Sequence, residues 1–113
     1  MTHVKGRRVY LSGPMTGIKD CNRDEFNRAE RAIRSYGGVV VYNPTSRADG
    51  FNLRGYSHAE CMRESIRSLC SIFNRFHVLV LLPGWENSAG ATLERTVAEA
   101  CGIEVCNIED VIA

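Results

Sequence analysis

The chain has 113 residues, 44% of them hydrophobic, and its 14 lysines and arginines nearly balance its 13 aspartates and glutamates. This length fits a single domain, residues 1–113, with a core large enough to fold without cross-links. The net charge of +1 argues against sequence-independent binding to nucleic acid or to an anionic membrane. The polar start of the chain and the lack of a long apolar run predict neither a signal peptide nor a transmembrane helix, so we expect a cytoplasmic protein.

The first half of the chain predicts two strands joined by a helix. Residues 8–12 form a short apolar run that ends at a Gly-Pro pair, which is typical of a strand followed by a loop. Apolar residues at three- and four-residue spacing follow Asn22, a candidate N-cap, and this helix stops at the glycine pair 37–38. Residues 39–42 predict a buried second strand. Residues 43–56 show no periodicity, so we expect a loop there.

The second half of the chain continues this alternation. Ser57 and Glu60 have the form of a capping box, and an apolar stripe from Met62 to Phe73 predicts the next helix. Residues 77–82 are the most hydrophobic run of the chain and predict a central strand that is covered on both faces.

The C-terminal part predicts a third helix, a last strand and a short final helix. Ser88 is the candidate N-cap of the third helix. The side chains expected to form its buried line are Leu93, Val97, Ala100 and Cys101. A strand is expected near residues 103–106, and residues 107–113 predict a short helix.

The five cysteines include no Cys-x-x-Cys pair, and no pair of nearby histidines accompanies them. This spacing predicts no metal site. We expect most of the cysteines, with Cys70 and Cys101 among them, to be packing residues, because free cysteines in a reducing cytosol commonly behave as small hydrophobic side chains.

Alternating strands and helices predict right-handed βαβ crossovers. The expected fold is therefore α/β, a flavodoxin/Rossmann-like three-layer fold in which a parallel sheet of four or five strands, in the order 2-1-3-4, has helices on both faces. In such a sheet, ligands bind at the carboxyl ends of strands 1 and 3, where the strand order reverses. The loops at these two ends lie within residues 10–17 and 82–94.

Both of these loops are rich in residues that expose the backbone. Gly13 and Gly17 allow N–H groups to approach a ligand closely, and Ser88 and Gly90 lie at a helix N-terminus, which favours phosphate or carboxylate. We therefore expect an anionic small molecule to bind here. The same composition also fits plain turns.

Glu94 lies on one helical line with Ala91 and Ala98, so its carboxylate is expected to face the crevice beside small residues. A partly buried carboxylate at this edge of the sheet is a candidate nucleophile or base. A solvated glutamate on the helix surface is the alternative. Arg95 and Glu99 have the spacing of a surface ion pair.

Three motifs occur in these segments. The chain carries Tyr-Leu-Ser-Gly-Pro-Met-Thr-Gly at 10–17, Asn-Pro at 43–44 and Leu-Leu-Pro-Gly-Trp-Glu-x-Ser-x-Gly-Ala-x-x-Glu at 81–94. By these motifs it resembles the nucleoside 2-deoxyribosyltransferase-like superfamily, and within it a branch of small bacterial and phage proteins. The superfamily also contains the 2'-deoxynucleoside 5'-monophosphate N-glycosidases.

The resemblance implies an enzyme of nucleotide metabolism, either an N-glycosidase or a deoxyribosyltransferase, that acts on a nucleoside or nucleotide without metal or cofactor. In such enzymes the glutamate that matches Glu94 attacks C1' of the sugar and displaces the base. The glycosyl-enzyme then passes its sugar to water or to a second base. Tyr10 is expected beside this carboxylate. Relatives commonly form homodimers, so a homodimer or a larger homo-oligomer is expected.

The resemblance also implies which residues bind the substrate. Ser88 and Gly90 match positions that hold a 5'-phosphate, and Trp85 either stacks on a base or lies in a subunit interface. The other residues expected to line the pocket are Gly13, Pro14, Met15 and Thr16. Asn43 is expected to border it, and an Asn-Pro turn without a binding role is the more common alternative.

Three positions depart from the family pattern. Ser65 stands where relatives usually carry an Asp that positions the sugar or helps the base to leave. Thr16 stands where the hydrolases have an Arg, whose charge Arg47, Arg54 or a second subunit could supply. His77 replaces another common Asp and is expected to be structural. The loss of the acid at position 65 keeps open an alternative function, a nucleotide-binding module with weak or no turnover, which senses or sequesters its ligand.

Overall fold

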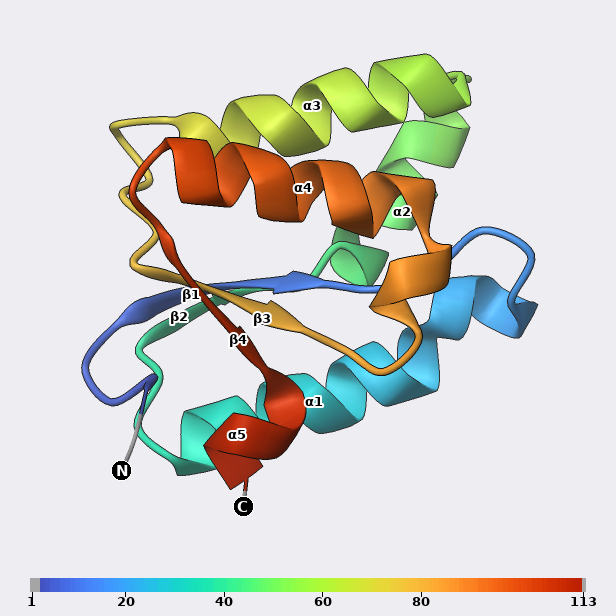
Figure 1. Cartoon of the computed structure of the whole chain (residues 1–113). Helices are drawn as coiled ribbons and strands as arrows, with labels where there is room; N and C mark the ends of the chain where they lie inside the picture. The colour runs from blue at the N-terminus through green and yellow to red at the C-terminus, as the bar shows by residue number, and fades with distance from the viewer. Residues whose placement is uncertain (1–2, 113) are drawn as a thin grey trace.

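The computed structural model describes residues 3–112, in which parallel strands alternate with helices (Figure 1). The strands are β1 (Arg8–Ser12), β2 (Val40–Tyr42), β3 (Val78–Leu81) and β4 (Glu104–Asn107). The helices are α1 (Arg23–Ser35), α2 (Thr45–Leu53), α3 (His58–Cys70), α4 (Ala89–Ala100) and α5 (Ile108–Ile112). Two short 3-10 helices, η1 (Lys19–Asn22) and η2 (Trp85–Asn87), precede α1 and α4.

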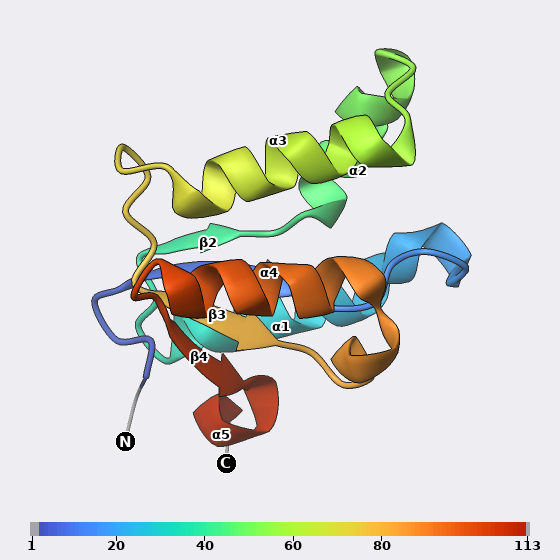
Figure 2. The ribbon, with the colours of Figure 1, turned by 45° about the horizontal axis from the view of Figure 1, so that its top comes forward.

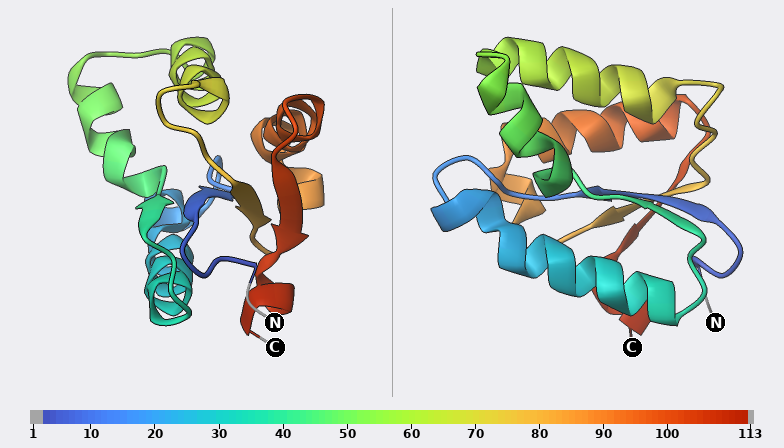
Figure 3. Two further views of the ribbon diagram at one scale, coloured as in Figure 1. Left: turned by 90° about the vertical axis from the view of Figure 1, so that its left-hand side faces the viewer. Right: turned by 180° about the vertical axis from the view of Figure 1, so that it is seen from behind.

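The four strands form one parallel sheet in the order β2-β1-β3-β4, which confirms the predicted order. Helices α1 and α5 lie on one face of this sheet and α3 and α4 on the other, as the end-on view in Figure 3 shows. The predicted three-layer α/β fold is therefore confirmed. Within residues 3–112, no helix is both long enough and apolar enough to cross a membrane.

The alternation of side chains along β1 decides which residues reach the functional face of the sheet. Val9 and Leu11 pack with Phe26 of α1 in one core cluster. Tyr10 points to the opposite face, where a second cluster packs beneath α3 and α4. Ser12, two residues further, lies on the same side as Tyr10 and contacts α4.

Residues 43–56 were expected to be a loop, and this prediction is wrong because α2 occupies Thr45–Leu53. The side chain of Asn43 starts the helix: its Oδ1 accepts hydrogen bonds from the backbone N–H of Thr45 at 3.0 Å and from the Thr45 hydroxyl at 2.6 Å. Within α2 only Thr45 and Phe51 are buried. Such a helix has no apolar stripe, so its sequence shows no helical period.

The starts of the other helices follow the prediction with one difference. Ser57 and Glu60 form the complete capping box of α3, as predicted. Asn22 precedes α1 but does not cap it, because it is left-handed, with φ 64°, and its Nδ2 donates to the carbonyl of Pro14 at 3.0 Å. The apolar stripe predicted from Met62 to Phe73 is too long, because α3 ends at Cys70 and Phe73 is 92% exposed.

Helix α4 begins at the predicted N-cap, where the hydroxyl of Ser88 accepts a hydrogen bond from the N–H of Ala91 at 3.1 Å. Its predicted buried line is wrong. The buried residues are Ala91, Glu94 and Ala98, whereas Leu93, Ala100 and Cys101 are exposed and Val97 is half-buried. The small side chains of Ala91 and Ala98 let this face of α4 approach the sheet closely.

The predictions for Cys70, Cys101 and Val39 are wrong, whereas the structural role predicted for His77 is confirmed. Cys70 and Cys101 were expected to be packing residues, but both are exposed, and Cys106 is the buried one of the five. His77 has the structural role that was expected, because its Nδ1 accepts a hydrogen bond from the N–H of Arg8 at 3.0 Å. Val39 was placed in the second strand, but it precedes β2 and is 57% exposed.

Candidate functional site

A cavity of about 730 Å³ opens where β1 and β3 end. Its walls are residues 13–16 after β1, residues 87–91 at the start of α4, and parts of α2 and of the first half of α3. In Figure 2 these segments lie together at one end of the molecule. A cavity of this volume at the point where strand order reverses is where α/β folds of this class bind small ligands.

Glu94 lines this cavity from the second turn of α4, and only 9% of the residue is exposed. Both of its carboxylate oxygens accept hydrogen bonds from β1. The Tyr10 hydroxyl donates to Oε2, and the Ser12 hydroxyl donates to Oε1 at 2.7 Å. The period of two along β1 brings both donors to the same side, so one strand holds both oxygens of the carboxylate.

Burial raises the pKa of the Glu94 carboxyl above its ordinary value, and the hydrogen bonds from Tyr10 and Ser12 oppose this rise. Burial also raises the pKa of the Tyr10 phenol well above its usual range, and the charge of Glu94 raises it further. Tyr10 therefore remains protonated and acts as a donor to the carboxylate. A buried carboxylate that titrates above its ordinary range is a common feature of catalytic sites.

The ring of Tyr10 is fixed by two aromatic neighbours. It stacks on Tyr42 of β2 with centroids 4.4 Å apart and 7° between the ring planes. Phe76 meets the edge of Tyr10 with centroids 5.4 Å apart. The hydroxyl of Tyr10 also approaches the carbonyl of Ser65 at 3.3 Å. These contacts hold the hydroxyl in place beside Glu94.

Most of the predicted binding residues line the cavity, namely Gly13, Pro14, Met15, Thr16, Ser88 and Gly90. Gly13 is required by packing, because a Cβ at this position would lie 2.8 Å from the Cβ of Leu82. At Gly90 a Cβ would lie 3.3 Å from the flexible sulfur of Met62. The absence of a side chain at Gly90 therefore keeps the start of α4 open toward the cavity.

The structure does not bring Asn43 and Trp85 into this cavity. Asn43 is buried, and its Nδ2 donates to Asn27 at 2.9 Å and to Glu30 at 3.0 Å, so its amide connects β2 to α1. Trp85 packs against the core cluster under α4, and the guanidinium of Arg95 lies 5.2 Å from the centre of its ring. Both residues support the fold around the site.

The cavity wall carries the carboxyl group of Glu94. Within the described part of the chain, Glu94 is the one carboxylate that lines it, and no lysine or arginine does so. The two arginines considered as phosphate ligands lie elsewhere, since Arg47 covers the ring of Tyr42 at 5.6 Å and Arg54 covers that of Tyr56 at 5.9 Å. Within residues 3–112, therefore, neither of these two arginines supplies the charge that Thr16 lacks, and a second subunit is the alternative that stays open.

Position 65, where the resemblance implies an Asp, faces the cavity and carries a hydroxyl. Ser65 lines the cavity from α3. The neighbouring Glu64 forms an ion pair with Arg67 at 2.7 Å and does not line the cavity. Glu64 therefore does not replace the missing acid.

Sequence reasoning missed several residues of the site. Ser12 could have been found, because it lies two residues after Tyr10 on the same strand. Phe51 and Tyr56, which stack at 5.4 Å, were missed because α2 was not predicted. His58, the first residue of α3, also lines the cavity.

The fold and the site together define a flavodoxin-like α/β protein with a buried glutamate in its switch-point cavity. The chain matches the family described as Domain of unknown function (DUF4406) over residues 7–107, and it belongs to this family. The match spans all four strands and includes Tyr10, Ser12 and Glu94. No curated protein and no solved structure matches the chain.

Proposed function

We propose that this protein cleaves the N-glycosidic bond of a nucleoside or nucleoside 5'-monophosphate, with Glu94 as the nucleophile. One observation carries the proposal: a buried carboxylate, held by two hydroxyl donors, lines a cavity of the size that small ligands occupy. The resemblance of the three sequence motifs to the nucleoside 2-deoxyribosyltransferase-like superfamily points to the same chemistry.

In the proposed reaction an oxygen of Glu94 forms a bond to C1' of the sugar while the bond from C1' to the base nitrogen breaks. The electron pair of that bond leaves with the base. Water or a second base then attacks C1', the ester is released, and Glu94 is regenerated. Tyr10 and Ser12 hold the carboxylate in one orientation, so the reacting oxygen is positioned before the substrate arrives.

The departing base needs a proton, and the cavity offers no second carboxylate among the residues that the structure describes. Ser65, which faces the cavity, is not acidic enough to supply one. This favours bases that leave readily as anions. The lack of a second carboxylate among the described residues of the cavity also supports a second candidate function. This is a nucleotide-binding module that keeps the cavity but converts its ligand slowly or not at all.

The first turn of α4 is the proposed position of the 5'-end of the substrate. Ser88 and Gly90 line the cavity there, and the positive end of the helix dipole favours an anion. Because no arginine or lysine of the described chain joins them, a 5'-monophosphate is expected to bind only slightly better than the nucleoside unless a second copy supplies a cation.

The test is base release from a panel of deoxyribo- and ribonucleosides and their 5'-monophosphates, measured by chromatography with and without an acceptor base. Glu94→Gln is expected to abolish release. Glu99→Gln is the matched control, because Glu99 lies on the same helix, is exposed and pairs with Arg95 at 3.7 Å. Release that survives Glu94→Gln would contradict the nucleophile, and tight binding without release would favour the module.

A further inference from the structure

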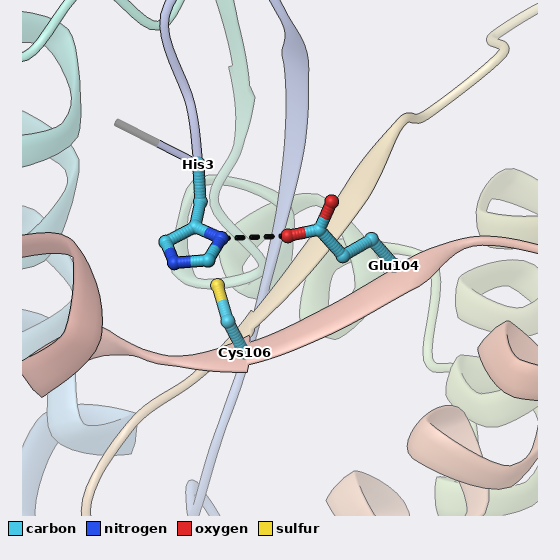
Figure 4. Close-up of side chains that lie close together, drawn as sticks. All are labelled: His3, Glu104 and Cys106. Carbon is cyan, nitrogen blue, oxygen red and sulfur yellow. Dashed lines mark hydrogen bonds and ion pairs between the residues drawn. The ribbon is translucent and has the colours of Figure 1, made fainter. Parts of the chain in front are cut away.

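Three potential metal ligands of different kinds meet at the edge strand β4, on the face of the sheet that lies away from Glu94 (Figure 4). His3 Nδ1 and Glu104 Oε2 are 2.7 Å apart. One ligand atom each from His3, Glu104 and Cys106 lies within 4.8 Å of the other two. In Figure 4 the sulfur of Cys106 points toward the imidazole ring of His3.

The backbone explains why these three residues converge. Glu104 and Cys106 are two residues apart on β4, so their side chains leave the strand on the same face. His3 comes from the other end of the chain. Arg7 holds it there, because its guanidinium donates to the carbonyl of His3 at 2.7 Å and to Oε1 of Glu104 at 2.9 Å. The contact to Oε1 leaves Oε2 directed at His3.

We propose that His3, Glu104 and Cys106 bind a zinc ion that fastens the N-terminal segment to the edge of the sheet. An imidazole nitrogen, a carboxylate oxygen and a thiolate sulfur are the three ligand types that zinc takes in proteins. Three protein ligands leave the fourth tetrahedral position to water. On binding, the thiol of Cys106 gives its proton to solvent and the sulfur bonds to the metal.

The geometry needs only a small adjustment to admit the ion. Zinc bond lengths place neighbouring ligand atoms about 3.4 Å apart around a tetrahedral site. The His3–Glu104 pair, now at 2.7 Å, therefore opens slightly, and both side chains shift toward the sulfur of Cys106, which lies within 4.8 Å of them. The side chains of His3 and Glu104 are 24% and 39% exposed, so they can move without disturbing the core.

The competing explanation is a plain ion pair between His3 and Glu104 that holds the N-terminal segment. In that case the thiol at the third corner is a packing residue, since Cys106 belongs to the core cluster that includes Val80 and Ile108. Cys106 is also the buried one of five cysteines, all of which lie in the described chain, and its burial keeps the sulfur in one place. A buried sulfur beside two partly exposed polar side chains that can adjust around an ion favours a metal site over an ion pair alone.

Cobalt(II) added to the reduced, metal-free protein tests the proposal, since a cobalt–thiolate bond gives a charge-transfer absorption band. We expect one equivalent of cobalt to produce this band and zinc to displace it. Zinc is expected to raise the melting temperature by about 10 °C when its free concentration is about a hundred times its dissociation constant. Glu94→Gln is expected to bind cobalt as the wild type does, so the test of the metal site is independent of the proposed function.

Variants assign the ligands. His3→Gln and Cys106→Ala are each expected to remove the band, whereas His58→Gln and Cys70→Ser, which change a histidine and a cysteine outside the cluster, are expected to retain it. His3 is partly exposed, so His3→Gln carries the test even if the buried Cys106→Ala does not fold. No band with millimolar cobalt, or a band that survives His3→Gln, would overturn the proposal and leave the ion pair.

Discussion

Replacing Tyr10 with phenylalanine tests the hydrogen bonding that defines the site. The substitution removes only the hydroxyl, which donates to Glu94 and approaches the carbonyl of Ser65. The phenyl ring keeps its stack on Tyr42 at 4.4 Å and its edge contact with Phe76 at 5.4 Å. Any loss of stability therefore reports on the hydroxyl and not on packing.

A hydrogen bond to a buried charged group contributes about 1.5–3 kcal/mol. Tyr10→Phe is thus expected to lower the free energy of unfolding by about that amount at neutral pH. For a chain of this length the melting temperature falls by roughly 6–12 °C. The loss should shrink at low pH, because Glu94 becomes protonated there and the lost bond is then between two neutral groups.

Denaturant unfolding of four proteins measures the interaction: the wild type, Tyr10→Phe, Glu94→Gln and the double variant. The effect of Tyr10→Phe is expected to be about 1 kcal/mol smaller in the Glu94→Gln background, where the acceptor is neutral. An equal effect of Tyr10→Phe in both backgrounds, or none in the wild type, would refute the hydrogen bond between Tyr10 and an ionised Glu94.

Further predictions concern titration, the missing acid and packing. Because the native pKa of Glu94 is raised, the folded protein binds the proton more tightly than the unfolded chain, so stability falls as the pH rises through that pKa. Glu94→Gln should therefore be more stable than the wild type at neutral pH, with the advantage fading in acid, as melting curves across pH will show. Ser65→Asp is expected to raise base release, by up to about 10²–10⁴-fold. An unchanged rate would show that position 65 takes no part in proton transfer. Gly13→Ala should cost about 1–3 kcal/mol in denaturant unfolding, because its Cβ would lie 2.8 Å from that of Leu82, whereas Gly90→Ala should keep its stability. Equal stability of the two glycine variants would contradict the packing argument.

The sequence predicted the sheet well because its strands are short and bounded by strong turn signals, and because β1, β2 and β3 are mostly buried. The run that became β3 is buried at every position, which only a central strand of a covered sheet requires. The strand order placed the loops after strands 1 and 3 at the same edge, and the resemblance implied that Tyr10 lies beside Glu94. The hydrogen bond between them confirms the geometry that was expected, and the nucleophilic role of Glu94 stays a proposal.

The parts that could not be predicted depend on contacts between residues far apart. Helix α2 has no apolar stripe, so periodicity could not find it or Phe51, which it brings to the cavity, where Phe51 stacks on Tyr56 beyond the helix end. Asn43 was read as a pocket residue, but its amide is used within the fold. The cluster of His3 and Cys106 was missed because spacing rules detect ligands close in sequence. These two residues lie at opposite ends of the chain, and His3 reaches β4 through its contact with Glu104 and the hydrogen bonds of Arg7.

The central claim is that Glu94 carries the sugar during the reaction. Rapid acid quenching of the protein with a nucleoside that it cleaves, followed by proteolysis and mass spectrometry, tests this directly. The account predicts a sugar adduct on the α4 peptide, located at Glu94, that is absent in Glu94→Gln and present in Glu99→Gln. Base release by Glu94→Gln at the wild-type rate, together with no adduct on this peptide of the wild type, would contradict the claim.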